Sequence, residues 1–313
     1  MKKNTYIFLI MLLAAMFASC DDNETLTPSD IDSLSRYEFP QGEENWDNIF
    51  DEIYQQHGTQ LLYKDFTSKD LEKKWVEDNA FGDAKYIWRY YPEDGTDTLQ
   101  VLSNYLRDKI FAYLNPEISK ETFKPYIYLA SGFQLASYFG EYVFYTNMPL
   151  LADGMDYWIF SLPPNVIYGK PLEANEKYIR TQIIAAYFRA AYERGALVMP
   201  AGFGNNVDYS TQLEIEDTTN ENYFLNRGFT HYINLQASNE KDMRIPPEGY
   251  KAEQLSKLKN GADFINYITA LIFDPDFNNT YKDYPLVLER ASIVIDYMKE
   301  QYDIDLIAIA QSN

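Results

Sequence analysis

The sequence has very few of the residues that cross-link a chain or bind metals. Among 313 residues there is one cysteine, Cys20, and there are two histidines, His57 and His231. A single cysteine excludes an intramolecular disulfide, even in an exported protein. Zinc sites are built mainly from cysteine and histidine, so the sequence contains few zinc ligands.

Long hydrophobic runs are also missing after the first residues of the chain. Lys2 and Lys3 precede an apolar stretch over residues 6–18, and small residues follow it just before Cys20. The stretch is shorter than the roughly 20 residues that a membrane-spanning helix needs. It therefore predicts a signal peptide over residues 1–19.

The four residues "FASC" that end at Cys20 resemble the lipobox of bacterial lipoproteins, with Phe17 where leucine is usual. This resemblance implies that Cys20 is lipidated with acyl chains such as palmitate and anchors the protein in the outer membrane. Two membrane signals are enough for stable anchoring. The alternative is an ordinary cleaved signal with an incidental cysteine.

Residues 20–33 are acidic and polar without apolar periodicity, which predicts a flexible tether. The acidic cluster after Cys20 resembles the surface-export signal of lipoproteins in bacteria that feed through TonB-coupled importers. The resemblance favours the cell surface, and a spacer facing the periplasm is the alternative.

Basic residues are scarce as well. The chain has 27 Lys and Arg against 47 Asp and Glu, a formal net charge of −20, and removal of the signal makes the balance more negative. Nucleic acid and anionic lipid surfaces are therefore poor partners.

The hydrophobic pattern divides the mature chain into two halves. Residues 44–58 show helical periodicity with Gly58 as a stop, and short aromatic or β-branched runs predict strands. Three of these strands are expected at residues 126–130, 138–145 and 157–162. Helices are expected at 175–198, 222–235, 251–272 and 284–302. We therefore predict an α+β fold with an α/β subdomain over 34–174 and a helical subdomain over 175–313.

Both histidines are better explained by structure than by chemistry. His57 lies at the expected C-terminal end of a helix, where the helix dipole favours an imidazolium. His231, in "RGFTHYINL", lies among aromatic residues and is expected to be half-buried and hydrogen-bonded. Neither has a Ser or Cys nucleophile at a recognisable spacing.

Two further motifs are weak. Asp274, Asp276 and Asn278 begin like a calcium loop, but Asn279 and Pro285 stand where that loop needs Gly and Glu. The aromatic run at residues 88–91 could stack on sugars if it were exposed, but buried strand residues are the better interpretation.

The helix expected over 183–198 reads as a core helix from its periodicity. Apolar residues recur at steps of three and four, and Arg189 and Glu193 form a possible i, i+4 pair on another face. The apolar positions are Ile179, Ile183, Ala186, Tyr187 and Ala190.

Several segments, taken in order, resemble the substrate-import-associated zinc metallohydrolase lipoproteins. The matching segments are "YEFPQGEENWDNIFDEIYQQHGTQLLYKDFT", "RGFTHYINLQ", "GADFINYITALIF" and "ASIVIDYMKEQYDIDL". The resemblance covers nearly the whole mature chain. It implies a zincin-like fold, a zinc-binding metallopeptidase ancestry and a place beside TonB-coupled importers and their surface glycan-binding lipoproteins.

The chain departs from that family where zinc would bind. The family carries His-Glu-x-x-His on the helix that matches 183–198, with two imidazoles for zinc and a glutamate that activates water. Here residues 189–195 contain no histidine, and at most Glu193 could touch a metal. The family's Glu-Asp-Phe-x-Glu on the later acidic helix is reduced to Asp263, with Ala262 and Asn266 in place of the glutamates.

These losses predict a scaffold that binds rather than catalyses, with no metal and no cofactor. The remnant site would comprise Arg189, Glu193, His231, Asp263 and Asn266. A peptide or glycan is the expected ligand class. An active hydrolase with unrecognised ligands and a structural subunit of the importer are the alternatives.

Overall fold

The computed structural model describes residues 36–71, 85–91, 97–152, 154–162, 173–234, 244–246 and 258–312. The chain divides into two compact units, Met1–Glu38 and Phe39–Asn313. Of the first unit only 36–38 are described, where the Arg36 guanidinium carbon lies 5.2 Å from the centre of the Tyr37 ring. Cys20 and the tether lie outside the described residues. In the described ranges no helix is long and apolar enough to cross a bilayer.

The second unit opens with helix α2 (Asn45–His57), followed by strand β1 (Gln60–Leu62). Glu44 and Asp47 form a reciprocal capping box at the start of α2, and Gly58 ends it in the left-handed conformation with φ of 74°. The expected helix and its stop are confirmed. A short helix α3 (Ser68–Leu71) follows.

A four-stranded sheet forms the centre of the N-terminal half. Its order is β1, β3 (Tyr126–Ala130), β7 (Tyr157–Ser161), β6 (Leu150–Leu151). The first three strands are parallel and β6 is antiparallel to β7. Parallel strands are buried on both faces, and β7 is buried at every position. The predicted strands at 126–130 and 157–162 are confirmed.

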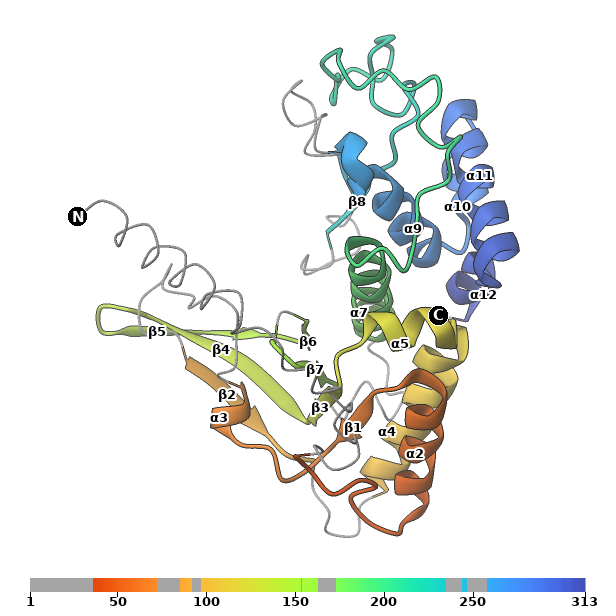
Figure 1. Ribbon diagram of the computed structural model, residues 1–313. Helices are drawn as coiled ribbons and strands as arrows, with labels where there is room; N and C mark the ends of the chain where they lie inside the picture. The colour runs from red at the N-terminus through yellow and green to blue at the C-terminus, as the bar shows by residue number, and fades with distance from the viewer. Residues whose placement is uncertain are drawn as a thin grey trace, which may run out of the picture. The chain divides into compact units, whose positions relative to one another are not determined.

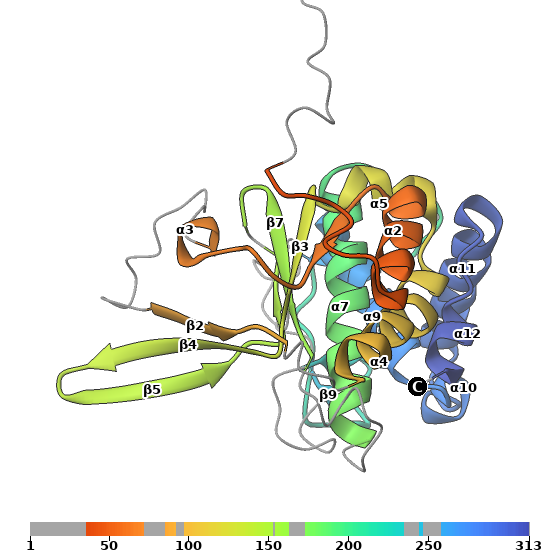
Figure 2. The ribbon, with the colours of Figure 1, turned by 90° about the horizontal axis from the view of Figure 1, so that it is seen from below.

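Helices cover one face of this sheet, as Figure 2 shows for α2, α4 (Thr98–Tyr105), α5 (Pro116–Thr122) and α7 (Glu173–Glu193). A π-helical turn (Leu106–Ile110) and a 3₁₀ turn (Phe111–Tyr113) continue α4. Trp158 of β7 points to this side, because its ring contacts Phe123 at 5.1 Å between centroids. Tyr128 of β3 instead stacks on Phe66 at 4.7 Å.

A second, antiparallel sheet lies on the opposite side of the first. It comprises β2 (Lys85–Arg89), β4 (Gly132–Phe139) and β5 (Tyr142–Asn147), in the order β2-β4-β5 (Figure 1). The single strand expected over 138–145 is wrong. Gly140 adopts a φ of 62° and makes a two-residue turn with Glu141, so these residues form a hairpin.

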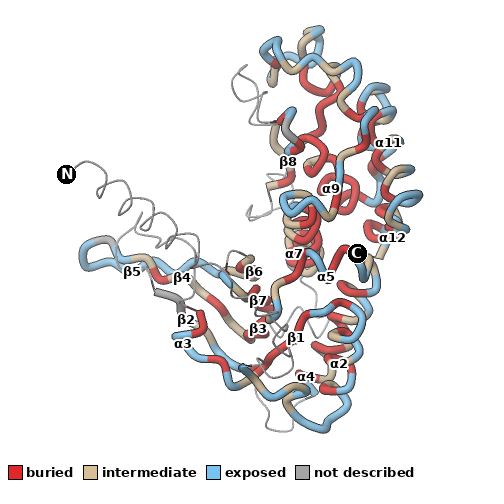
Figure 3. Tube along the Cα trace, in the orientation of Figure 1, coloured by how far each residue is buried: buried red, intermediate tan, exposed pale blue. Residues whose placement is uncertain are grey.

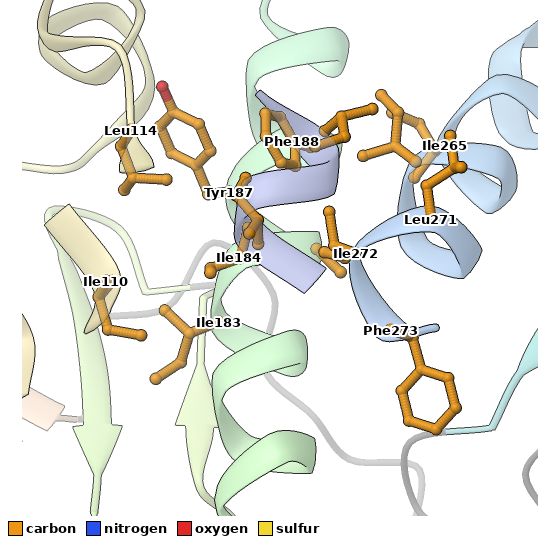
Figure 4. Close-up of a cluster of buried hydrophobic side chains, with 14 of the residues drawn as sticks. Ile110, Leu114, Ile183, Ile184, Tyr187, Phe188, Ile265, Leu271, Ile272 and Phe273 are labelled. Atoms are coloured by element: carbon orange, nitrogen blue, oxygen red, sulfur yellow. The ribbon is translucent and has the colours of Figure 1, made fainter. Parts of the chain in front are cut away.

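The C-terminal half is helical, and α7 packs on α9 (Asp263–Phe273). Figure 4 shows Ile183 and Tyr187 on the side of Ile110 and Leu114, while Phe188 lies toward α9. Helix α7 is therefore buried on two sides, as the burial colours of Figure 3 also show. Three further helices follow: α10 (Phe277–Thr280), α11 (Pro285–Tyr302) and α12 (Leu306–Gln311).

Three expected helices differ from the structure. The helix expected over 175–198 ends at Glu193, and Gly195 follows it with a φ of 79°. In place of the helix expected over 222–235, the described residues 222–234 form turns and the short strand β8 (Tyr232–Ile233), which pairs with β9 (Arg244–Ile245). Gly228, with φ of 77°, reverses the chain there. Helix α9 begins only at Asp263, after a π-helical turn (Leu258–Ala262); residues 251–257 lie outside the described ranges.

Sheets and helices together make the unit Phe39–Asn313 an α+β fold, as predicted. The sheet-bearing and helical halves both belong to this one unit. The finer division at residue 174 stays a prediction.

Candidate functional site

The five residues of the expected remnant site lie on three elements. Arg189 and Glu193 are on α7, Asp263 and Asn266 are on α9, and His231 directly precedes β8. Helices α7 and α9 are in contact, so the question is whether the side chains meet.

Arg189 and Glu193 are both exposed at the surface of α7. The i, i+4 ion pair expected between them is absent, because within the described residues no carboxylate lies within 4 Å of the Arg189 guanidinium. The buried positions around them are Tyr187, Phe188 and Ala191. This part of α7 therefore uses its apolar residues for packing and leaves its charges in solvent.

Asp263 is buried and fully engaged. Its Oδ2 accepts a hydrogen bond from Nη2 of Arg290 on α11 at 2.6 Å, and another from the hydroxyl of Tyr209 at 2.9 Å. Both partners of the ion pair have side chains only 4–6% exposed. Buried charges require such pairing and hydrogen bonding.

Arg290 connects this carboxylate to the surrounding core. Its Nη1 donates to the carbonyl oxygen of Gly228 at 2.6 Å, and its guanidinium carbon lies 4.0 Å from the centre of the Phe203 ring. Burial opposes the charge on Arg290, but Asp263 opposite it raises the pKa of the guanidinium above its usual value. Burial raises the pKa of the Asp263 carboxyl, and Arg290 and Tyr209 oppose this rise. The 2.6 Å bond between Arg290 and Asp263 ties α9 to α11.

His231 belongs to a different cluster. Its Nδ1 lies 3.0 Å from the hydroxyl oxygen of Tyr281, and its ring meets Phe224 edge-on at 5.0 Å. Burial, with a smaller effect of Arg244, lowers the pKa of His231 to about 4. The imidazole is therefore neutral at pH 7. Its neighbours, Tyr281 and Phe224, do not belong to the expected remnant site.

In the described part of the chain, the structure shows no hydrogen bond, ion pair or ring contact among the five candidate residues. Asn266 is half-buried on α9. Asp263 is engaged with Arg290 and Tyr209, and His231 with Tyr281.

The residues present do not fit zinc. Zinc selects nitrogen and sulfur ligands, and α7 contributes none because its sequence has neither histidine nor cysteine. Over the described residues, no three His, Cys, Asp or Glu side chains are grouped closely enough to hold a metal ion. At Asp263 a cation would also meet the positive charge of Arg290.

The sequence that resembles a calcium loop has a structural role. Oδ2 of Asp274 accepts from Nη2 of Arg244 at 2.6 Å and from Oγ1 of Thr280 at 2.8 Å, and its Oδ1 accepts from the backbone N–H of Asp276. These bonds hold the turn between α9 and α10. They use the oxygens of Asp274 that a cation would need.

His57 corrects one expectation. It is 2% exposed, and burial, with a smaller effect of Lys120, lowers its pKa to about 4. Desolvation therefore outweighs the helix dipole, and the ring is neutral instead of an imidazolium. Its ring packs 5.0 Å from that of Phe111.

The aromatic run at residues 88–91, which begins in β2, is partly buried, as expected. Tyr91 is buried and its hydroxyl donates to the carbonyl oxygen of Leu162 at 2.7 Å, while Trp88 packs on Phe66. Only Tyr90 is exposed. More strongly exposed aromatic residues lie elsewhere, on β5, where the sequence predicts one ordinary strand over 138–145.

Arg290 was also missed by the sequence reasoning. It stands in "LERASIVI", an ordinary helical stretch. Its buried partner is 27 residues earlier in the chain. No local pattern in the sequence signals such a pairing.

No family model matches the chain, and a comparison with curated proteins finds no match. Among solved structures, the chain is similar to a "putative zinc-binding metallo-peptidase" from Bacteroides caccae, with a TM-score of 0.41 and 10% identity over 86% of this chain and 92% of that one. A similarity of this degree carries no conclusion about activity or metal binding. Membership of the metallohydrolase lipoprotein family stays a prediction from the sequence.

Proposed function

We propose that this protein is a non-catalytic binding lipoprotein built on a metallopeptidase-like scaffold. The observation that carries the proposal is the buried ion pair of Asp263 and Arg290. The one acid kept on the helix expected to supply a metal ligand is neutralised by a guanidinium. The α7 sequence has no imidazole, so neither helix supplies the ligands of a zinc hydrolase.

The proposed setting follows from the start of the chain. Cys20 carries the lipid anchor in the outer membrane, and Asp21 and Asp22 after it direct the protein to the cell surface. There it serves a TonB-coupled importer together with a surface glycan-binding lipoprotein, and it binds a peptide or glycan that the importer handles. The anchor and the surface location rest on the resemblance of the N-terminal residues to lipoprotein signals. The importer, its partner lipoprotein and the ligand class rest on the resemblance of the mature chain to the metallohydrolase lipoproteins.

A cleavage assay tests the absence of catalysis. The purified full chain, supplied with zinc, is incubated with a mixture of random peptides, and products are identified by mass spectrometry with and without a chelator. We expect no cleavage beyond that of a sample without protein. Cleavage that the chelator abolishes, and that Glu193→Gln also removes, would show an active hydrolase and overturn the proposal.

A further inference from the structure

The edge strand β5 exposes its side chains at every one of its six positions. Tyr142 is 71% exposed, Phe144 58% and Tyr145 60%. Tyr138 on the neighbouring β4 is 41% exposed. Contiguous exposed aromatic residues of this kind mark interaction sites in soluble proteins.

These side chains lie on both faces of the hairpin. Tyr145 pairs with Ala136 and Val143 with Tyr138, so Tyr138, Val143 and Tyr145 share one face. The alternate residues Tyr142 and Phe144 project from the other face. A flat ligand stacked on one face would leave the aromatic residues of the other face in solvent.

The backbone of β5 is available for pairing along its outer edge. The sheet order over the described residues ends at β5. The N–H of Met148 donates to the carbonyl oxygen of Phe133 at 2.9 Å. Because bonded and non-bonded pairs alternate in an antiparallel ladder, the N–H and C=O groups of Val143 and Tyr145 point away from β4.

This edge lacks the features that normally protect a sheet edge. Proline and charged residues, lysine above all, block edge-to-edge pairing. Strand β5 contains none of them, and the sixteen residues from Gly132 to Asn147 include one charge, Glu141 in the turn. The opposite edge strand, β2, carries Lys85 and Arg89 at its ends.

The exposed area is too small for a stable dimer through this strand. An aromatic side chain presents about 150–250 Å², so the exposed fractions of the four aromatic residues leave roughly 450 Å² on both faces together. A standard interface needs about 800 Å² from each partner. Two copies, each with a net charge of −20, would also repel each other.

We infer that β5 binds an extended segment of another polypeptide as an added antiparallel or parallel strand. An added strand forms backbone hydrogen bonds with Val143 and Tyr145, and its alternating side chains contact the aromatic residues on both faces. The net charge of the chain selects a segment that is apolar and neutral or basic. The inference does not depend on the proposed loss of catalysis, because β5 shares no residue with the remnant site.

The test is selection of random displayed peptides on the full chain, followed by affinity measurements with variants. Val143→Pro removes an outward N–H without removing a ladder bond to β4, whereas the control Val143→Ala keeps that N–H. We expect apolar, neutral or basic peptides whose affinity falls about tenfold or more with Val143→Pro and much less with Val143→Ala. Unchanged melting temperatures show that both variants fold.

Two further variants separate an added strand from binding to one face. Tyr145→Ser and Phe144→Ser remove aromatic rings from opposite faces, and both should weaken the selected peptides. The inference is overturned if no peptide selected depends on Val143→Pro, or if only one face matters. Binding of neutral oligosaccharides that is lost with Tyr145→Ser and kept with Val143→Pro would instead identify a glycan platform.

Discussion

At the scale of single residues, the ion pair with Arg290 engages the Asp263 carboxylate in the core of the helical half. Side chains of both residues are buried and 2.6 Å apart. Removing one partner from a buried pair leaves the other charge uncompensated. We therefore expect the carboxylate to stabilise the fold.

We predict that Asp263→Asn lowers the free energy of unfolding by about 3 kcal/mol, because Arg290 then stays buried without its counter-ion. Urea denaturation followed by circular dichroism measures the change. The control Lys299→Ala removes the exposed pair with Asp303 and should leave the denaturation midpoint nearly unchanged. An equal, small effect of both substitutions would show that the buried pair does not stabilise the fold.

The neutral state of His57 makes stability depend on pH. Its pKa is about 4 in the folded protein and 6.5 when exposed. The unfolded chain binds a proton first as the pH falls, so stability is lost between pH 6.5 and 4. This change amounts to up to about 3 kcal/mol.

Replacing His57 with glutamine should therefore make the pH dependence of the melting temperature between pH 6.5 and 4 less steep, and His231, whose pKa is also about 4, should account for part of the dependence that remains. The comparison is made between slopes, so a lower stability of the variant at neutral pH does not affect it. Parallel curves for the two proteins would mean that His57 has the same pKa in the folded and unfolded states, and that burial does not lower it.

At the scale of elements, the contact between α7 and the start of α9 depends on a glycine. Gly261 has a φ of 99°, and a Cβ there would lie 2.1 Å from the hydroxyl oxygen of Tyr192 on α7. The glycine therefore allows the turn before α9 to approach α7 closely. This approach positions Asp263, two residues later, for Arg290.

We predict that Gly261→Ala lowers the free energy of unfolding by about 2 kcal/mol or more, from backbone strain and displacement of Tyr192. The matched control is Gly202→Ala, where a Cβ meets nothing within 4 Å and φ is not positive. Thermal unfolding measures both variants. If Gly261→Ala is no worse than the control, the close contact is not required.

The elements predicted from the sequence are those with a local signal. Helix α2 and its stop at Gly58 follow from periodicity and a left-handed glycine, and β3 and β7 follow from unbroken apolar runs. The sequence predicts one strand over 138–145, where the structure has the hairpin of β4 and β5, because Tyr138 and Tyr145 continue the aromatic pattern across the turn. Residues 222–235 have apolar spacing compatible with a helix, but Gly228 and its carbonyl contacts to Tyr267 and Arg290 reverse the chain.

For the candidate site, the sequence predicts which metal ligands are absent but not which contacts the remaining residues make. The absence of histidine from α7 is visible in the sequence, since it needs no partner to be recognised. The engagement of Asp263 and His231 depends on Arg290 and Tyr281, which are distant in the chain, and the sequence does not show which residues they contact. The desolvation that keeps His57 neutral likewise arises only from tertiary packing.

At the scale of the whole molecule, the proposed location depends on one residue. We attribute anchoring to lipid on Cys20 because residues 17–20 resemble a lipobox. We predict that Cys20→Ala moves the protein from the membrane fraction to the soluble fraction, as measured by fractionation and immunoblotting. Retention of the variant on membranes at high salt would contradict the lipid anchor.

We propose that the protein binds no zinc, and its zinc content tests this proposal most directly. The full chain is purified after expression with added zinc, and its metal is measured by elemental analysis. We predict far less than one zinc per chain and a melting temperature that a chelator does not change, since a bound metal would stabilise the fold. Stoichiometric zinc that is lost with His231→Ala would contradict the account and identify His231 as a ligand.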